Sequence, residues 1–292
     1  MPDDPFNTAA LRRSVLDAWA ASPARFREDA NAEEDYALGG YRDRVVVELA
    51  QNAADAATRA GVPGRLRLAL RDGVLTAANT GAPLDAAGVA ALSTLRASSK
   101  RDDSSVGRFG VGFAAAVAVS DEPSIASATG AVRWSRAATL EAVTQIPSLA
   151  AELGARSGQV PVLRLPFPTD TAPPDGFATE VTLPLRDAEA ADLVARLLAE
   201  AGPALLLALP ALAEITISLD GRTRRLTGSR DGDDVTITAD GDASHWHTAA
   251  ASGTLAPALL ADRPAEERAR PSWALQWAFE TNNADCTSGG FG

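Results

Sequence analysis

Five stretches of the chain predict helices, from the spacing or the density of their apolar residues. The predicted helices cover residues 8–21, 41–60, 83–95, 110–119 and 187–208. Gly61 and Pro63 end the second helix, and Asp85 begins the third. The acidic stretch 27–40 separates the first two helices and is predicted to be a loop. The polar stretch 96–106 is predicted to be a second, mobile loop.

Alternating apolar and polar residues predict short strands between and after these helices. Residues 65–79 alternate on both sides of Asp72-Gly73, which is the pattern of a β-hairpin. Further strands are predicted within residues 124–129, 131–136, 160–167, 178–185, 214–228 and 233–243. Because the pattern changes to strands with Asp-Gly turns near residue 210, we expect one domain over 1–210 and a β-rich segment, the beginning of a second domain, over 211–292.

The amino-acid composition disfavours some classes of binding partner. The chain has 292 residues, of which 46% are hydrophobic and 22% charged, as in soluble globular proteins. Its net charge of −11 disfavours nucleic acid and anionic membranes as partners, because both require a basic face. The single cysteine, Cys286, permits no internal disulfide and fits a reducing compartment. There is no signal-peptide pattern and no apolar run of about 18 residues. We therefore expect a cytoplasmic location.

The helix at 41–60 carries the first candidate chemistry. Glu48, Asn52 and Asp55 are four and three residues apart, so they share one face of the helix. Carboxylate and amide oxygens are the ligands that Mg2+ prefers, and a carboxylate can also activate a water molecule. Taken alone, this row is more commonly an ordinary solvated face.

A glycine cluster at 107–112 is the second candidate. Gly107, Gly110 and Gly112 lie at the start of the helix predicted at 110–119, where glycines would let a phosphate approach free backbone N–H groups. Lys100, the only lysine among 27 basic residues, lies seven positions upstream and could add a compact charge to a phosphate. The spacing fits neither a Walker A loop nor the Rossmann fingerprint. A glycine-rich loop packed on the core is the plain alternative.

Two further positions lie at strand ends. Asn79-Thr80-Gly81 ends the predicted hairpin, where a short polar side chain beside a glycine turn can face a planar base. Thr179 stands at the start of the later strand in 178–185. Each feature alone is unremarkable, but together and in this order they match one pattern.

That pattern resembles the GHKL, or Bergerat-fold, ATPases, a superfamily that includes the heat-shock-protein-ninety chaperones, gyrase, MutL and histidine kinases. "ELAQNAADA" (48–56) is similar to the family's E-L-x-x-N-A-x-D-A helix, and "NTG" (79–81) stands where the family has D-x-G. The resemblance implies that Glu48 is the general base, Asn52 the Mg2+ ligand and Asp55 a nucleotide contact. It also implies that Asn79, Gly81 and Thr179 form the adenine site. The phosphate-binding residues implied by "GRFGVGF" are Gly107, Arg108, Phe109, Gly110, Val111, Gly112 and Phe113, together with Lys100.

The resemblance covers about residues 10–210 and is strongest to the sacsin-type ATP-binding domains of large chaperone-like proteins. It implies an α+β fold, a two-layer α/β sandwich with a mixed sheet covered by helices on one face. It further implies ATP and Mg2+ as cofactors, slow ATP hydrolysis, unfolded client proteins and an ATP-dependent homodimer. The alternative is a non-hydrolysing nucleotide-sensing module of a larger defence or signalling scaffold. A third reading is an inactive fold that serves only as an interaction surface.

Four positions depart from these patterns or stand outside them. Asn79 replaces the acid of the family motif, so the adenine contact would run through an amide, and Pro83 replaces its second glycine. His245 and His247 are two residues apart and would share one face of a strand. With no third ligand nearby in the sequence, a strand end is a better interpretation of these histidines than a metal site.

Overall fold

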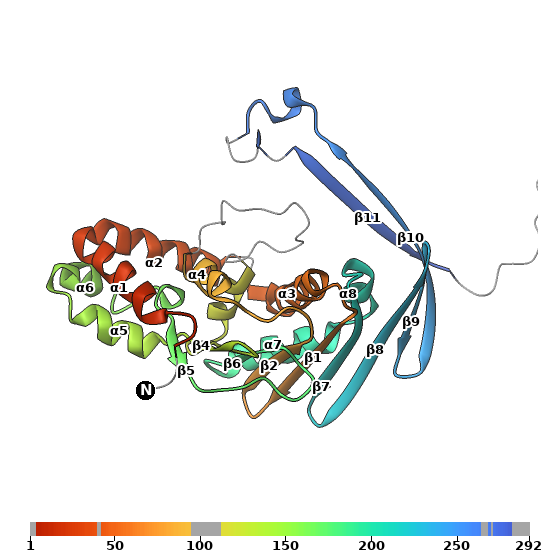
Figure 1. The fold of residues 1–292 in the computed structure, drawn as a ribbon, viewed down its shortest axis with the longest axis horizontal. Helices are drawn as coiled ribbons and strands as arrows, with labels where there is room; N and C mark the ends of the chain where they lie inside the picture. Colours follow the sequence, from red (N-terminus) through yellow and green to blue (C-terminus); the bar gives the residue numbers. More distant parts are fainter. Residues whose placement is uncertain (1–3, 40–41, 95–111, 264–267, 270, 282–292) are drawn as a thin grey trace, which may run out of the picture.

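The computed structural model describes residues 4–39, 42–94, 112–263, 268–269 and 271–281 (Figure 1). Within these residues, eleven strands form one mixed sheet in the order β11-β10-β9-β8-β7-β1-β2-β6-β3-β4-β5. β1 and β7 run parallel, and the other neighbouring pairs are antiparallel. The strands are β1 (Gly64–Arg71), β2 (Val74–Asn79), β3 (Ser124–Ser127), β4 (Gly130–Arg133), β5 (Phe167–Thr169), β6 (Thr179–Pro184), β7 (Leu212–Leu219), β8 (Arg222–Asp231), β9 (Asp234–Ala239), β10 (Asp242–Thr254) and β11 (Ser272–Glu280).

Helices pack against this sheet and against one another. The α-helices are α1 (Thr8–Ala21), α2 (Pro23–Leu38), α3 (Val45–Ala60), α4 (Ala86–Thr94), α5 (Arg136–Thr144), α6 (Ala150–Ala155), α7 (Ala188–Glu200) and α8 (Pro203–Ala208). Short 3-10 helices complete the set: η1 (Arg42–Arg44), η2 (Gly112–Ala118), η3 (Pro147–Leu149), η4 (Val162–Arg164) and η5 (Pro257–Leu260). Among the described residues, no helix is both long and apolar enough to cross a membrane.

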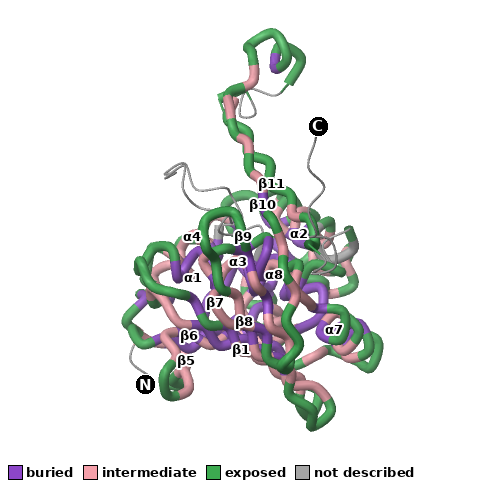
Figure 2. The backbone as a smooth tube through the Cα atoms, turned by 90° about the vertical axis from the view of Figure 1, so that its right-hand side faces the viewer, coloured by how far each residue is buried: buried purple, intermediate pink, exposed green. Residues whose placement is uncertain are grey.

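The main core lies between the central strands and the helices α3 and α7. Leu66 and Leu68 of β1 are buried there, whereas Arg65 is exposed and Arg67 half-buried, so the strand alternates between a core face and a polar face. α3 contributes an apolar stripe, and the alanines in it let the helix approach the strands closely. Figure 2 shows the buried residues concentrated in these central elements, while the residues of the arm formed by β10 and β11 are mostly exposed or half-buried.

A smaller core joins the helices of the N-terminal region. Trp19 of α1 and Phe26 of α2 meet edge to face, with ring centroids 5.2 Å apart. Both rings are fully buried and pack with residues of the segment 143–165. These helices form the part of the molecule on the left of Figure 1, beyond the strands β3, β4 and β5.

Most of the predicted elements are confirmed, and with them the combination of helices and a mixed sheet. The predicted helices at 8–21, 41–60, 83–95 and 187–208 correspond to α1, η1 with α3, α4, and α7 with α8. The hairpin around Asp72-Gly73 is β1–β2, and the Asp-Gly turns after residue 210 connect β7 through β10. The described part of 110–119 forms the 3-10 helix η2. The predicted loop 96–106 lies outside the described residues.

The loop predicted at 27–40 is wrong, because residues 27–38 belong to α2. Pro23 stands in the first turn of the helix, where its missing N–H costs nothing. Phe26, Ala30 and Glu33 form the buried face, with exposed fractions of 0%, 2% and 5%. The pattern did not predict a helix because Glu33 stands on the buried face, and acidic residues normally stand on the solvent face.

The strand predicted at 160–167 is also wrong. The segment forms η4 and only enters β5 at Phe167. The backbone N–H groups of Val162 and Leu163 donate to the carboxylate of Glu33 at 2.6 and 2.9 Å instead of to a neighbouring strand. Prolines on both sides of the segment remove further donors. A long-range contact with α2 therefore decided its conformation.

The predicted boundary near residue 210 falls between α8 and β7. β7 lies beside β1 in the sheet, with Leu66 opposite Ile215, so hydrogen bonding continues from the residues before 210 into those after it. The polar end of the chain, residues 282–292, lies outside the described residues. Whether 211–292 folds as a second domain stays a prediction.

We expect the buried carboxyl of Glu33 to make stability depend on pH. Burial raises its pKa from 4.5 to about 7, while the N–H groups of Leu163 and Val162 and the nearby Arg164 oppose the shift. Since the folded-state pKa is raised, the contribution of Glu33 is fully present below about pH 4.5 and is lost as the pH rises to about 7. The loss corresponds to about 3 kcal/mol.

Urea unfolding of the wild type and of Glu33→Gln, at about pH 4 and about pH 8, measures this contribution. The fall in unfolding free energy between the two pH values should be about 3 kcal/mol smaller in the variant. Glu34→Gln is the matched control, because Glu34 is on the same helix but pairs with Arg156 near the surface. An equal change in both variants would contradict the assignment.

Candidate functional site

Helix α3 presents two stripes side by side. Val46, Leu49 and Ala53 belong to the apolar stripe that packs into the core. The polar stripe next to it contains Glu48 and Asn52, one turn apart. Burial of the first stripe therefore fixes the direction in which the second one points.

A pocket that is partly open to solvent lies between α3 and the strands β2, β3 and β6. Its polar lining comes from Asn52, Asn79, Thr179 and Arg59. The apolar lining is formed by Ala56, Ala82, Leu84, Leu92, Phe113, Ile125 and Val181. A mostly apolar lining with a few polar groups is typical of small-molecule sites.

Four predicted site residues thus line one pocket. Asn52, Asn79, Phe113 and Thr179 belong to four separate sequence motifs, and the fold brings them together. Gly112 begins η2 immediately before Phe113, whose side chain is buried against Trp134. The predicted phosphate-binding residues Lys100, Gly107, Arg108, Phe109, Gly110 and Val111 lie outside the described residues.

Asn79 is held at the end of β2 by its backbone and its side chain. It is 8% exposed, and its Nδ2 donates to the carbonyl of Thr80 at 3.0 Å. In the sheet Asn79 stands opposite Thr179, the first residue of β6. The hydrogen bond to Thr80 fixes the amide plane and uses one N–H donor, so the carbonyl oxygen is the acceptor that this side chain can offer a ligand.

Ser127 was missed by the sequence analysis although it connects several walls of the pocket. It stands opposite Thr179 in the sheet, and the two hydroxyl oxygens are 3.3 Å apart. Its Oγ also accepts from the N–H of Leu84 at 2.9 Å and donates to the carbonyl of Ala178 at 3.2 Å. A serine within an ordinary strand pattern belongs to no recognisable motif. Its role is therefore visible only from the pairing of β3 with β6.

Gly81 positions the loop that follows β2. Its φ is +119°, and a Cβ there would lie 2.5–2.7 Å from backbone atoms of Ala56 and Ala57. The next residue, Ala82, donates its N–H to the carbonyl of Ala56 at 2.9 Å. A glycine is therefore needed for the loop to touch α3, and this contact closes one side of the pocket.

Glu48 and Asp55 lie beside the pocket on α3 but are not among the residues that line it. The side chain of Glu48 is 13% exposed, and its carboxylate is 3.8 Å from the guanidinium of Arg44. Burial raises the pKa of Glu48, and the charge of Arg44 opposes the shift. Asp55 is 2% exposed, so it is almost completely enclosed.

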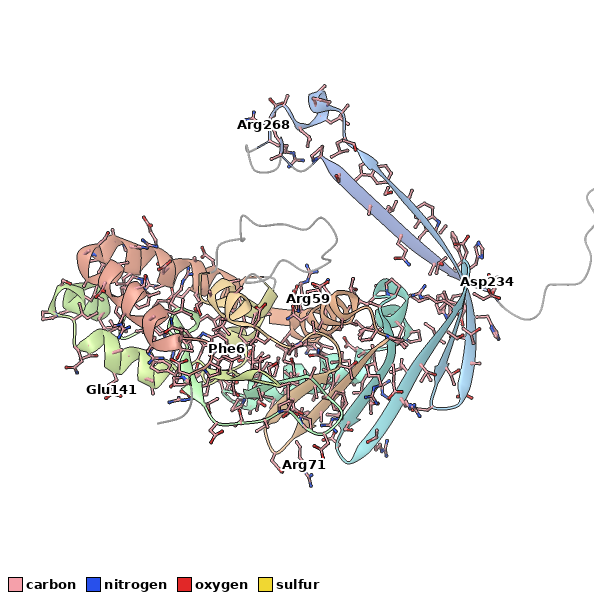
Figure 3. The ribbon with its side chains drawn as sticks, viewed as in Figure 1. Phe6, Arg59, Arg71, Glu141, Asp234 and Arg268 are labelled. Carbon is pink, nitrogen blue, oxygen red and sulfur yellow. The ribbon has the colours of Figure 1, made fainter. Side chains whose placement is uncertain are left out.

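Arg59 is a second residue that the sequence analysis missed. It lies seven positions after Asn52 on α3, and Figure 3 shows its side chain on the outer side of that helix. The spacing of Asn52, Ala56 and Arg59 by four and three residues could have identified it, because residues at this spacing share one helix face. Arg59 adds a positive charge to the rim of the pocket.

His245 and His247 do share one face of β10. His245 contacts Thr236 through Nδ1 at 3.2 Å, and His247 pairs with Asp234 at 2.9 Å. Within the described residues, no group of three or more His, Cys, Asp or Glu side chains is placed to hold a metal ion.

We expect Gly81→Ala to destabilise the fold far more than Gly73→Ala. Both glycines have positive φ, which costs an alanine about 1–2 kcal/mol, but a Cβ at Gly73 meets nothing within 4 Å. At Gly81 the Cβ would collide with the backbone of α3, so a further loss of about 2 kcal/mol or more is expected. Urea unfolding of the two variants provides the comparison, and equal losses would contradict the close contact.

No protein-family model matches the chain, and no curated protein matches it. The pocket and the motifs that supply its residues are therefore the basis for inferring a function.

Proposed function

We propose that this pocket binds ATP together with Mg2+ and hydrolyses it slowly, as in a GHKL-type domain of a chaperone-like protein. One observation carries the proposal: four motifs that resemble this superfamily, spread from residue 52 to residue 179, supply side chains to a single pocket. Residues this far apart in the sequence have no local reason to meet. The mixed sheet with helices packed on its core face is compatible with the two-layer Bergerat fold.

The inner part of the pocket has the chemistry of a base-binding site. Ile125, Val181 and Leu92 offer apolar surface to the faces of a planar ring. The carbonyl oxygen of Asn79 can accept a hydrogen bond from the exocyclic amine of adenine. Guanine presents a carbonyl oxygen at the equivalent position, so the proposal predicts a preference for ATP over GTP.

The outer part has donors that fit Mg2+ and phosphates. Asn52 faces the pocket, and Glu48 lies one turn before it on the same stripe of α3, so an amide oxygen and a carboxylate are both within this region. Oxygen donors of this kind suit Mg2+. Asn52 would hold the ion, which when bound neutralises charge on the phosphates. Arg59 provides a further cation at the rim.

Glu48 is the residue that we assign as general base. A base must accept a proton at neutral pH, and a pKa raised by burial brings a carboxylate closer to that range. The guanidinium of Arg44, 3.8 Å from the carboxylate, compensates part of its charge. In this mechanism Glu48 accepts a proton from water, while residues of the pocket hold the nucleotide in place.

Isothermal titration calorimetry with Mg·ATP is the primary test. Asn52→Ala should reduce Mg-dependent binding to an undetectable level, because the metal loses its amide ligand, while folding by circular dichroism stays unchanged. Gln51→Ala is the matched control, since it removes the neighbouring amide on α3 from outside the pocket lining. If Asn52→Ala binds Mg·ATP as well as the parent protein, the proposed role of α3 is wrong.

A second test separates hydrolysis from binding. Glu48→Gln should leave ATP binding within about threefold and remove turnover, because a general base acts in the transition state. Turnover by the wild type should also fall at acid pH, with a midpoint above 4.5, as Glu48 becomes protonated. Phosphate release in single-turnover reactions measures the loss of turnover and its pH dependence, and calorimetry measures ATP binding.

Glu180→Gln is the control for this test. Burial raises the pKa of Glu180 as well, but the side chain pairs with Arg67 at 3.9 Å on the polar side of the sheet. Turnover that survives in Glu48→Gln would remove its assignment as the base. Binding without any turnover in the wild type would favour the nucleotide-sensing alternative.

A further inference from the structure

β11 carries an exposed row of large apolar side chains. Trp273, Leu275, Trp277 and Phe279 alternate along the strand, so they share one face, which we call the aromatic strip. Their exposed fractions are 40%, 56%, 39% and 56%. These four residues account for most of the exposed large hydrophobic side chains among the described residues. A contiguous row of this kind normally marks an interaction surface.

The strip lies on an arm that has little support from the rest of the sheet. β9 pairs only with residues 242–247 of β10, whereas β10 pairs with β11 as far as Thr254. The outer part of the arm is therefore a ribbon of two strands, which Figures 1 and 2 show projecting away from the body. On the other side of the ribbon, Gln276 reaches back to the carbonyl of Leu207 in α8. Such ribbons are marginally stable unless their apolar face is covered.

The partners of the strip on β10 are small except at Phe279, which stands opposite His247. Ala249, Ala251 and Gly253 lie opposite Trp277, Leu275 and Trp273. A Cβ at Gly253 would lie 3.0–3.1 Å from the ring of Trp273, so this ring rests directly on the glycine. The face is thus broad and flat, and it carries no carboxylate or guanidinium between Trp273 and Trp277.

We propose that the aromatic strip is a self-association surface, on which a second copy of this chain packs its own strip face to face and antiparallel. In this arrangement Trp273 meets Phe279 of the second copy, and Leu275 meets Trp277. The four residues of the strip then contact large apolar side chains, with His247 beside Phe279 at each end, and the two-fold symmetry closes the assembly as a dimer.

Charge supports the antiparallel arrangement. The chain carries a net charge of −11, so two copies repel each other wherever their bodies come close. The strip itself contains no charged residue, and antiparallel arms place the two bodies at opposite ends of the contact. An uncharged contact between acidic bodies should become tighter as salt screens the repulsion.

The area of the strip predicts a weak dimer. From the exposed fractions, the four side chains offer roughly 400 Å2 per copy, or about 800 Å2 for the pair. The small residues of β10 bring the total near the ~1,000 Å2 of the smallest specific interfaces. We therefore expect dissociation constants in the micromolar range.

Sedimentation velocity from about 1 to about 100 µM, without nucleotide, should show a reversible monomer–dimer equilibrium. Trp277→Ser should weaken it by roughly thirtyfold, as expected for a central tryptophan. Leu259→Ser is the control, because Leu259 is 69% exposed but lies in η5, outside the strip, and it should change nothing. A monomer at every concentration, growth beyond dimers, or equal effects of both variants would overturn the proposal.

A charge exchange tests the antiparallel contact independently of any loss of stability in the arm. Leu275→Asp and Trp277→Lys should each be monomeric, because each places a charge against an apolar side chain of the second copy. Mixed together, the two variants should form a heterodimer, since the introduced carboxylate of one copy would face the introduced ammonium of the other. Absence of a heterodimer, with both variants folded by circular dichroism, would overturn the arrangement. Because no nucleotide is present, these results do not depend on the function of the pocket.

Discussion

The pocket depends on one close contact between the loop after β2 and the backbone of α3. Gly81 lies so near Ala56 and Ala57 that no side chain fits between them, and Ala82 donates a hydrogen bond to the carbonyl of Ala56. Two rigid elements are joined at this point, with Asn79 on one and Asn52 on the other. The two amides therefore face the same space without relying on flexible side chains.

A second set of contacts connects the N-terminal helices to this core at an energetic cost. Glu33 is almost fully buried and accepts two backbone N–H groups, and Arg164 pairs with Asp29 at 2.8 Å and donates to the carbonyl of Ser93 in α4. Removing such charges from water opposes folding, and the hydrogen bonds offset only part of that cost. These ion pairs and hydrogen bonds instead fix the orientation of three elements. They hold α2, η4 and α4 in one relative position beside the wall of the pocket.

The arm of β10 and β11 contrasts with both of these regions. The central strands bury one face under α3 and α7, whereas the outer arm leaves an aromatic face in solvent. The proposed nucleotide site and the proposed self-association surface are carried by the same sheet, on strands separated by β1, β7, β8 and β9. Backbone hydrogen bonds connect every neighbouring strand of this sheet, also across residue 210.

The amino-acid sequence by itself determined the elements whose patterns are local. The stripe of α3, the Asp-Gly turns and the alternation of β1 and β2 follow from spacing and turn chemistry within a few residues. The four motifs that supply Asn52, Asn79, Phe113 and Thr179 are also recognisable from the order of residues alone. Only the tertiary structure decided that α2 is a helix with Glu33 inside, and that 162–164 is not a strand. It also decided that Arg59 lines the pocket and that Ser127 connects two of its lining residues, Leu84 and Thr179. These outcomes depend on groups more than forty residues apart in the chain or on which helix face the core leaves open, and a local pattern carries no information about either.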